Sequence, residues 1–576
     1  LDQDCFFLSL KFMKIFNFSL KIIVQILFVT FILSTSPAKS LDKFNKSDRI
    51  SDYFSGILLL NDNQYEKSFN FLKKLNGLEA SHINYSIKYL YSLVNSGNLK
   101  EAFNYSKKLE KQKLDSFESN LVMGIFYLKN SNLDLAQKYF LKAKTKNSKL
   151  ILNNFVSNFL YSWSKLDNYD LREASVELKK LDQRFENLKK IQNVFLNCYF
   201  NSSNTNNLFE ELISNKKTDF SRFNYFYASY SVSLKKIDKA KDIINSALKS
   251  YPRNLLLNQY KLDLNQGNII SIFDCKNKEH IIAEILYITS NALSSQSIYS
   301  LSNFYLNLAK HLNENFHTYD NLLAENFFKV NNFEEAKKIY NNLGKKGGVY
   351  KWHASKQLAK IYIQEENKKK ALELVSIAYN NLAIKDIYET FDYAEFLKNN
   401  EKFEESIPFY TKVISEVKKD HLLYAESTDG RGVAYERTGE WDKAEKDLLA
   451  SLDADSEQAY VINYLAYTWI EQGVKIEKSL SMLEKANKLR SNDPYITDSL
   501  GWALFKLKKY REAKEYLQLA VKLMPGDPVV NDHYGDVLWK NGNEIQARYY
   551  WNYVLNLKKT EEELKKTIEQ KLIKGL

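Results

Sequence analysis

Apolar side chains recur along this chain at steps of three and four residues, which is the spacing of one face of an α-helix. Two such runs follow one another in SLGWALFKLKKYREAKEYLQLAVKLMP, residues 499–525. Each run carries a small residue, Gly501 in the first and Ala513 in the second, twelve positions apart. Two antiparallel helices approach closely only where both have a small side chain at their crossing. The pattern therefore predicts a pair of packed helices.

This two-helix unit recurs roughly every 34 residues, in about eleven copies over residues 50–557. No single pair of helices buries its apolar face alone, so neighbouring pairs must stack on one another. The chain is thus expected to be an all-α solenoid. The small residues that mark the helix crossings most clearly are Gly432, Ala444, Ala466, Gly501, Ala513, Ala520, Gly535 and Ala547.

The composition supports a mostly helical chain with a large apolar interior. Among 576 residues there are only 17 Gly and 6 Pro, whereas folds built from many tight turns use both freely. Aromatic residues make up 14%, which excludes a disordered chain. The net charge of +12 comes mainly from scattered Lys without dense Arg-rich blocks. It indicates solvated helix faces rather than a nucleic-acid partner.

The repeat resembles the tetratricopeptide repeat, whose helix-turn-helix units wind into a right-handed superhelical solenoid. Three segments of the last third resemble one branch of that family, the exported repeat proteins of Gram-negative bacteria: INYLAYTWIEQG (462–473), DPYITDSLGWALF (493–505) and NDHYGDVLWKNG (531–542). The resemblance implies a protein-binding adaptor of the periplasm or outer membrane, because some members serve carboxy-terminal processing proteases. This chain lacks the lipidated Cys that such outer-membrane members carry.

The first 40 residues have the pattern of a secretory signal peptide. A basic stretch after Met13 precedes the apolar run Ile22–Leu33, and Ala38-Lys39-Ser40 fits the small-x-small cleavage pattern. The apolar run is shorter than the roughly 20 residues of a membrane-spanning helix. We therefore expect cleavage after Ser40 and export to the periplasm, with an uncleaved inner-membrane anchor as the alternative. Residues 1–12 precede this Met and are expected to be an over-extended start.

The regularity of the repeat divides the rest of the chain. The twelve-residue spacing is lost in 160–221 and 253–282, so we place a soft boundary near residue 275. Diverged repeats are expected over 41–275 and regular repeats over 276–557.

A charged helix is expected to close the array over residues 558–576. Thr560 and Glu563 have the Thr-x-x-Glu spacing of a capping box at its start, and Gly575 marks its end. A polar terminal helix would cover the last apolar face of the solenoid.

The sequence contains no nucleophile, metal-ligand or phosphate-loop motif. The glycines of GKKGG (344–348) stand in the wrong order for a phosphate-binding loop and indicate a connector between repeats. His533 lies between Asp532 and Asp536 with no nucleophile or metal partner nearby, so a hydrogen-bonded structural role is expected. No catalysis, cofactor or metal is expected.

Two cysteines, Cys198 and Cys275, would remain after removal of the signal. An exported chain could oxidise this pair. The two residues are 77 positions apart, about two repeats along an elongated array, which disfavours a disulfide. The sequence leaves their pairing open.

By the resemblance, the first helix of each pair lines a concave groove that binds an extended peptide. The groove-facing positions are three before the small residue, one after it and four after it. Short carboxylate or amide side chains at the first position would bond a peptide backbone, and aromatic rings would take its apolar side chains. A basic or amide-rich segment suits such a set. The candidates are Asp429, Asn463, Asp498 and Asp532 at the first position, Tyr467, Trp502 and Asp536 at the second, and Phe505 and Trp539 at the third.

Two plainer interpretations of these candidates stay open. Asp498 and Asp532 come shortly after prolines that begin helices, so they would serve as helix caps. The large rings of Trp502, Phe505 and Trp539 would fill the space between repeats.

The sequence thus predicts a non-catalytic scaffold or adaptor that binds another protein of the cell envelope, with a protease or a cell-wall enzyme as the expected class of partner. Membrane contact is expected only through the N-terminal segment, and neither nucleic acid nor a small-molecule substrate is expected. The diverged N-terminal half is a candidate second surface. The alternatives are a self-associating component of an envelope assembly, a regulatory subunit, and a cytosolic or inner-membrane repeat protein.

Overall fold

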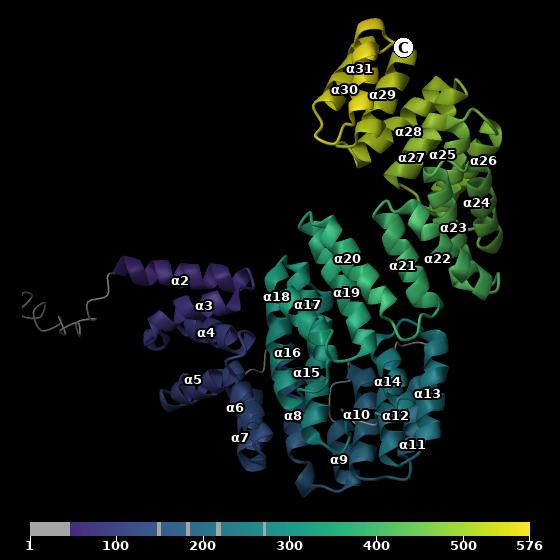
Figure 1. The fold of residues 1–576 in the computed structure, drawn as a ribbon. Coiled ribbons are helices and arrows are strands. Elements are labelled where there is room, and N and C mark those ends of the chain that lie inside the picture. Colours follow the sequence, from purple (N-terminus) through teal and green to yellow (C-terminus); the bar gives the residue numbers. More distant parts are fainter. Residues whose placement is uncertain (1–45, 147–150, 180–184, 215–220, 269–271) are drawn as a thin grey trace, which may run out of the picture. The chain divides into compact units, whose positions relative to one another are not determined.

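A computed structural model of the chain describes residues 46–146, 151–179, 185–214, 221–268 and 272–576 (Figure 1). Throughout these ranges the backbone forms 30 α-helices and three short 3-10 turns, with no β-strand. The expectation of an all-α solenoid of stacked helix pairs is confirmed. The expected signal peptide, 1–40, lies outside the described residues. Across the described helices, none combines the length and the apolar composition that crossing a bilayer requires.

By compactness the chain divides into two units that interleave along the sequence. Unit 1 comprises the described residues up to 217 together with 271–336, and unit 2 comprises 218–270 together with 337–576. The chain therefore passes from one unit to the other three times. The expected boundary near residue 275 concerns the regularity of the repeat, which this division does not measure, and it stays a prediction.

Unit 1 contains the N-terminal helix pairs and one later group of helices, and its second boundary falls inside α18. Its helices are α2 (Lys46–Asn61), α3 (Tyr65–Leu72), α4 (Ile83–Asn95), α5 (Leu99–Lys111), α6 (Phe117–Lys129), α7 (Leu133–Lys146), α8 (Ile151–Ser164), α9 (Leu171–Lys179), α10 (Glu186–Tyr199), α11 (Thr205–Ser214), α15 (Lys278–Ser295), α16 (Tyr299–Leu312), α17 (Thr318–Lys329) and the start of α18 (Phe333–Leu343).

In unit 1 the later helices pack on the first helices of the earlier pairs. α16 lies against α4 and α6, and α15 lies against α8. Amide side chains fix this contact: Asn303 Nδ2 donates to Tyr65 Oη at 3.0 Å, and Asn95 Nδ2 donates to the backbone oxygen of Ser300 at 3.1 Å. The first-helix face of α4, α6 and α8 is thus covered by the chain itself.

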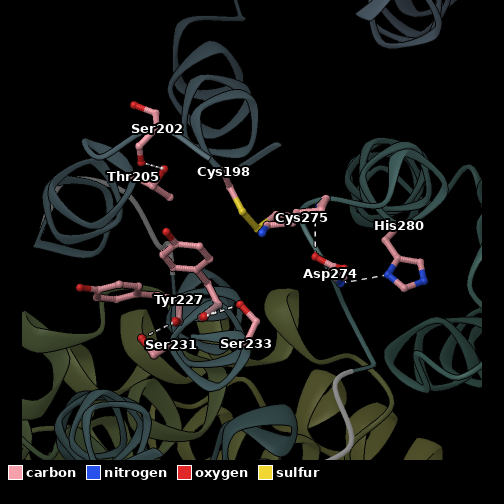
Figure 2. The surroundings of a disulfide bond; sticks show 11 residues. Cys198, Ser202, Thr205, Tyr227, Ser231, Ser233, Asp274, Cys275 and His280 are labelled. Carbon is pink, nitrogen blue, oxygen red and sulfur yellow. Dashed lines mark hydrogen bonds between the residues drawn. A yellow bond between two sulfur atoms is a disulfide. The ribbon is translucent and has the colours of Figure 1, made fainter. Parts of the chain in front are cut away.

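A disulfide joins Cys198, in α10, to Cys275, in the segment that precedes α15 (Figure 2). Their Cα atoms are 5.9 Å apart, within the range that a disulfide spans, and both cysteines are buried. The expectation that 77 residues would separate them by two repeats is wrong. The chain leaves unit 1 after α11 and returns to it just before α15, which brings Cys275 back to α10.

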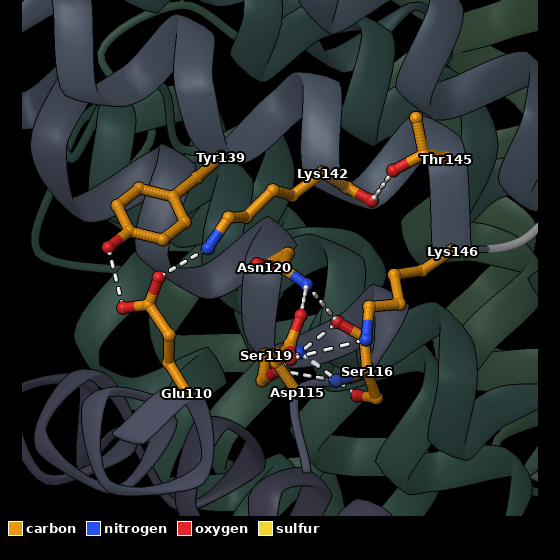
Figure 3. A network of polar contacts seen from close by, with 9 residues as sticks. All are labelled: Glu110, Asp115, Ser116, Ser119, Asn120, Tyr139, Lys142, Thr145 and Lys146. Atoms are coloured by element: carbon orange, nitrogen blue, oxygen red, sulfur yellow. Dashed lines mark hydrogen bonds and ion pairs between the residues drawn. The ribbon is translucent and has the colours of Figure 1, made fainter. Parts of the chain in front are cut away.

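A network of polar contacts ties α5 to α7, one repeat further along unit 1 (Figure 3). Glu110 on α5 accepts hydrogen bonds from the Tyr139 hydroxyl, at 2.7 Å, and from the Lys142 ammonium, both on α7. Between them α6 begins with a reciprocal cap, in which Ser116 Oγ accepts from the backbone N–H of Ser119 and Ser119 Oγ accepts from that of Ser116. Contacts at one repeat's distance therefore hold the register of the stack.

Unit 2 begins with three helices, is interrupted while the chain passes through unit 1, and then continues to the C-terminus. The helix that resumes the stack, α19, packs directly on α14. The helices are α12 (Ser221–Ser233), α13 (Ile237–Ser250), α14 (Leu255–Asn265), α19 (Gly348–Gln364), α20 (Lys368–Asn380), α21 (Ile387–Asn399), α22 (Phe403–Glu416), α23 (Leu422–Arg437), α24 (Trp441–Ala454), α25 (Ala459–Glu471), α26 (Ile476–Leu489), α27 (Pro494–Lys506), α28 (Tyr510–Leu523), α29 (Pro528–Lys540), α30 (Glu544–Leu555) and α31 (Glu562–Lys574).

The glycines at the helix crossings permit a contact that a Cβ atom would block. A Cβ on Gly501 would lie 2.7 Å from Leu517 Cγ and 3.1 Å from the Leu517 backbone nitrogen. Gly432 and Gly535 bear the same relation to the residues sixteen positions after them. The structure places the alanines of the pattern in the interior as well, each with an exposed fraction of 0%: Ala444, Ala466, Ala513, Ala520 and Ala547.

The terminal helix α31 is present, but its start differs from the expectation. Glu561 is the N-cap residue and makes no side-chain cap, so the expected box of Thr560 and Glu563 is wrong. The Thr560 hydroxyl turns back instead and donates to the backbone oxygen of Val554 at 2.6 Å. The helix ends at Gly575, as its composition predicted.

Candidate functional site

The candidate groove residues lie on the first helices of unit 2. Of these helices, α25, α27 and α29 pack on one another in order, which brings candidates of neighbouring repeats together. We call the residues at the first groove position, Asp429, Asn463, Asp498 and Asp532, the polar ladder. α23 carries Asp429, α25 carries Asn463 and Tyr467, α27 carries Asp498, Trp502 and Phe505, and α29 carries Asp532, Asp536 and Trp539.

Asp498 and Asp532 do not cap helices, so that interpretation is wrong. The caps are Asp493 and Asp527, whose carboxylates accept the backbone N–H groups two and three residues later. Each helix starts at the proline just after its cap, so Asp498 and Asp532 lie more than one turn inside, where both are buried. Their carboxylates are free to bind groups from other helices.

Asp498 binds an imidazole from the next repeat. Nδ1 of His533 donates to Oδ2 of Asp498 at 2.9 Å, and both side chains are buried. The His533 ring stacks on Trp502 with 3.9 Å between ring centroids, and Trp502 stacks on Phe505 at 4.7 Å. Burial alone would lower the pKa of His533, but Asp498 and the neighbouring carboxylates outweigh it and raise the pKa. The expected hydrogen-bonded role of His533 is confirmed.

Asp532 and Asp536 share an ammonium group that α31 supplies. Nζ of Lys571 lies 2.7 Å from Oδ1 of Asp532 and 2.8 Å from Oδ1 of Asp536. Asp536 also accepts a hydrogen bond from Nε1 of Trp551 at 3.0 Å. Burial and the adjacent Asp532 raise the pKa of Asp536 to about 6, although Lys571 acts in the opposite direction. The last position of the polar ladder is therefore occupied by the chain's own lysine.

The tryptophan candidates are largely packing residues. Trp502 is only 8% exposed and donates its Nε1 hydrogen to Glu471 at 2.6 Å. Trp539 packs on Trp551 with 5.5 Å between ring centroids. The Arg548 guanidinium lies 4.6 Å from the ring centroid of Trp539. The ring of Trp539 thus packs against two residues of α30.

α25 presents a polar atom that lacks a partner. Oδ1 of Asn463 is buried and has no hydrogen-bond partner in the described part of the chain. One turn later, burial and then the charges of Glu471 and Asp498 raise the pKa of the Tyr467 hydroxyl above its usual value. Since buried polar atoms in native proteins are almost always bonded, the oxygen of Asn463 is an exception on this face.

Asp429 belongs to a separate acidic group on α21 and α23. Burial, together with Glu395 and Glu426, raises the pKa of Asp429 to about 6, against the opposing effect of Lys398. Lys398 is itself paired with Glu395 at 2.8 Å. Carboxylates therefore outnumber ammonium groups here. Within the described ranges, no three His, Cys, Asp or Glu side chains gather as metal ligands.

Sequence reasoning missed three residues that shape this face: Lys571, Glu395 and Glu426. Glu426 comes three positions before Asp429 on the same helix, so the helical period could have found it. Lys571 follows Asp536 by 35 positions and lies on another helix, and no spacing rule connects the two.

Comparisons with known proteins identify the repeat. Residues 329–560 match the tetratricopeptide repeat family model. The chain is 30% identical, over 126 residues, to the TPR repeat-containing protein PA4667 of Pseudomonas aeruginosa. This match covers 22% of the chain and 20% of that protein, so the chain spans about a fifth of the length of this relative. Tetratricopeptide repeats are protein-interaction scaffolds.

Solved structures of repeat proteins overlap with about a third of the chain. MamA of Desulfovibrio magneticus RS-1 is 16% identical, with 31% of this chain and 99% of that chain covered and a TM-score of 0.27. YrrB, described as a TPR protein with an unusual peptide-binding site, is 17% identical, with coverages of 32% and 92% and a TM-score of 0.27. PilF of Pseudomonas aeruginosa is 20% identical, with coverages of 32% and 85% and a TM-score of 0.27.

Proposed function

We propose that this chain is a non-catalytic scaffold that binds a lysine-bearing or amide-rich segment of another protein along the first helices of unit 2. The observation that carries the proposal is the position of the Lys571 ammonium between the carboxylates of Asp532 and Asp536. Its ammonium lies within 2.9 Å of all four carboxylate oxygens, and its side chain is 15% exposed. Charge-assisted bonds of this kind are the chemistry that a basic segment would use.

Asp429 and Asn463, the first two positions of the polar ladder, have no such ammonium in the described structure. Asp429 lies in a group with an excess of carboxylates, and Asn463 has a buried oxygen without a partner in the described residues. We propose that the partner segment donates hydrogen bonds to these two residues, as the ammonium of Lys571 does to Asp532. In unit 1 the corresponding helices are covered by α15 and α16, which favours unit 2 as the binding surface.

We place this scaffold in the periplasm, as an adaptor for a protease or a cell-wall enzyme. The secretory pattern of the first 40 residues supports export. The disulfide of Cys198 and Cys275 supports it as well, because such bonds persist in oxidising compartments. An adaptor would act by holding its partner and the partner's client close together, which raises their effective concentration.

A pull-down from envelope extract tests the proposal. The bait is the chain from residue 41 onward, compared with its Asp429→Asn/Asn463→Ala variant. We expect one envelope protein to be enriched by the parent chain and lost with the variant. The matched control is Asp442→Asn/Asn552→Ala, which changes the same residue types at exposed positions of α24 and α30. This control should retain the partner.

Two results would contradict the proposal. Equal enrichment with the parent and the ladder variant would move the binding to another face. No enriched partner, together with concentration-dependent mass in sedimentation, would favour the self-associating alternative. Thermal melts of all variants ensure that a lost partner does not reflect a lost fold.

A further inference from the structure

The terminal helix α31 lies against residues at three of the candidate groove positions, all on α29. The ammonium of Lys571 bonds the carboxylates of Asp532 and Asp536. Four residues later, Gly575 packs so closely on the third of them, Trp539, that a Cβ atom on Gly575 would overlap the indole ring. The last positions of the candidate groove are therefore covered by a segment of the chain itself.

Apolar residues of α31 complete this contact. Ile568 is fully buried, and Leu564 and Leu572 pack on the apolar core that α28, α29 and α30 share. Relative to Leu564, Lys571 stands seven residues later, so all four side chains lie on one face of the helix. The surface of α29 and α30 thus accepts a helix that combines an apolar stripe with one ammonium group.

Few buried contacts attach α31 to the stack. Only Ile568 is buried among the 13 residues of α31, whereas ten of the 13 residues of α29 are buried. The N-cap residue of α31, Glu561, makes no side-chain cap. Elements with few buried contacts open at a lower free energy than the interior of a domain. α31 can therefore leave its site while the repeats stay folded.

A comparison with the preceding repeat separates a fixed contact from an exchangeable one. Asp498 binds His533, and Asp536 binds Lys571, in each case 35 positions later on the chain. His533 stacks on Trp502 and lies on a helix that is buried over most of its length. Lys571 lies on a helix with a single buried residue. The bond to Asp498 is thus part of the stack, whereas the bond to Asp536 can be taken over by another lysine.

We propose that Asp532, Asp536 and Trp539 form a binding site for a lysine-bearing amphipathic helix of a partner protein, and that α31 closes this site until such a helix displaces it. The inference rests on the function proposed above, and it specifies the partner segment. That segment is a helix with a lysine beside apolar residues at the spacing found in α31. A basic loop would satisfy the two carboxylates but not the apolar surface beside them. α31 is then an autoinhibitory segment as well as a cap.

A peptide with the sequence of residues 561–576, labelled with fluorescein, is the probe. This α31 peptide reproduces the helix that the site already accepts, and fluorescence anisotropy measures its binding to the full chain. We expect it to bind Lys571→Met, in which α31 is released, at least tenfold more tightly than the parent, in which the site is closed. Lys574→Met changes an exposed lysine of the same helix and is the matched control. It should bind the peptide no better than the parent does.

Further variants locate the binding. Adding Asp532→Asn/Asp536→Asn to the Lys571→Met chain should abolish the gain. An α31 peptide that itself carries Lys571→Met should bind the Lys571→Met chain at least tenfold more weakly than the unchanged peptide. Gly575→Val opens the site in a second way, because it removes the fit to Trp539 and leaves the lysine and both carboxylates in place. This variant should also bind the peptide more tightly than the parent.

Three results would overturn the inference. The first is equal peptide binding by the parent and by Lys571→Met. The second is binding that persists without the two carboxylates, which would place the peptide elsewhere. The third is no binding by Lys571→Met and by Gly575→Val, with thermal melts that show folded repeats, because α31 would then be a permanent cap.

The pull-down separates this inference from the function on which it rests. Lys571→Met should enrich the envelope partner more strongly than the parent does, and an excess of the α31 peptide should displace that partner. Equal enrichment by the two chains would overturn the closure of the site by α31. Peptide binding as expected, with no partner enriched by either chain, would support the site and its closure and contradict the proposed function.

Discussion

His533 and Asp498, on adjacent first helices, are joined through Nδ1 and Oδ2 at 2.9 Å in the interior of unit 2. The bond links α29 to α27 across one repeat, and the stack of His533 on Trp502 reinforces it. A buried charged pair of this kind is strongly destabilising to break, because the remaining charge is left unmatched. It also makes the stability of this part of the solenoid depend on pH.

Replacement of His533 by Gln should destabilise the chain most at low pH. The pKa of His533 is raised on folding. Its charged pair with Asp498 is therefore fully stabilising below the unfolded value of about 6.5, and that contribution is lost as the pH rises through the folded value. We expect the melting temperature of His533→Gln to fall below that of the parent at about pH 5.5, with the difference shrinking toward about pH 9. Differential scanning calorimetry gives the melting temperatures of the parent and the variant at each pH.

His353 provides the control for that experiment. Burial and then Lys356 and Lys360 lower the pKa of His353 to about 4, so its ring is neutral over the whole range. The unfolded chain protonates this residue below about pH 6.5 whereas the folded chain does not, so His353→Gln should show the opposite trend: its melting temperature should rise relative to the parent as the pH falls from about 9 to about 5.5. A shift in His533→Gln that is independent of pH, or that follows the trend of His353→Gln, would disprove the charged pair.

Asp429→Asn should stabilise the chain at alkaline pH. The folded pKa of Asp429 is about 6, against about 3.9 in an unfolded chain. The folded state therefore favours the protonated form, and stability falls as the pH rises from about 4 through 6. Asn is neutral throughout, so the variant should gain about 2–3 kcal/mol in unfolding free energy at about pH 8 and nothing at about pH 4. Urea unfolding measures the gain, and the exposed Asp442→Asn should show none.

Gly501→Ala should destabilise the crossing of α27 and α28. The added Cβ would lie 2.7 Å from Leu517 Cγ and 3.1 Å from its backbone nitrogen, so a backbone must move. We expect a loss of about 1–2 kcal/mol in unfolding free energy, since overpacking outweighs the better helix propensity of Ala. Gly526→Ala is the matched control, because no atom lies within 4 Å of a Cβ at that position. Equal stability of the two variants would contradict the tight crossing.

Lys571→Met should release the terminal helix. The substitution keeps most of the side-chain volume but leaves Asp532 and Asp536 buried without their ammonium, at a cost of about 3 kcal/mol. Hydrogen exchange should show faster exchange across α31 while α12 and α13 are unchanged. Lys574→Met, at an exposed position of the same helix, should exchange as the parent does. Unchanged protection of α31 in Lys571→Met would mean that apolar contacts alone hold it.

Loss of the disulfide should destabilise unit 1. Cys198→Ser/Cys275→Ser opens a covalent loop of 77 residues, and removal of such a bond costs about 2–5 kcal/mol. Chemical denaturation of the oxidised parent and of the variant should show this difference, and dithiothreitol should bring the parent to the variant's stability. When the parent is alkylated without reductant, mass spectrometry should find neither Cys198 nor Cys275 alkylated. Two free thiols in the protein purified without reductant would contradict the pairing.

Much of the fold could be predicted because each repeat is stabilised by short-range contacts. Gly501 packs against Leu517, sixteen positions later, and the same relation recurs at Gly56, Gly124, Gly432 and Gly535. Such a contact leaves a spacing that can be read along the chain. The helix pairs, the solenoid and the closing helix before Gly575 all follow from it.

The candidate site was only partly predictable. Resemblance selected the helix positions of Asp498 and Asp532, and the alternative that they cap helices was a misassignment. Asp493 and Asp527 directly precede the prolines in the sequence, which is the N-cap position by local rules, and the structure places the caps there. The partner of Asp532, Lys571, lies on a helix 39 positions away, and no pattern within one repeat connects them.

The sequence by itself determined the repeat, its helices and the small residues at their crossings, because these depend on neighbours within one or two turns and one adjacent helix. Only the tertiary structure decided which segments of the chain belong to each of the two units. It also decided that Cys198 bonds to Cys275 and that α15 and α16 cover the first helices of unit 1. Every helix pair presents a similar apolar face, so periodicity alone cannot tell which distant segment covers it. Packing over the whole chain makes that choice.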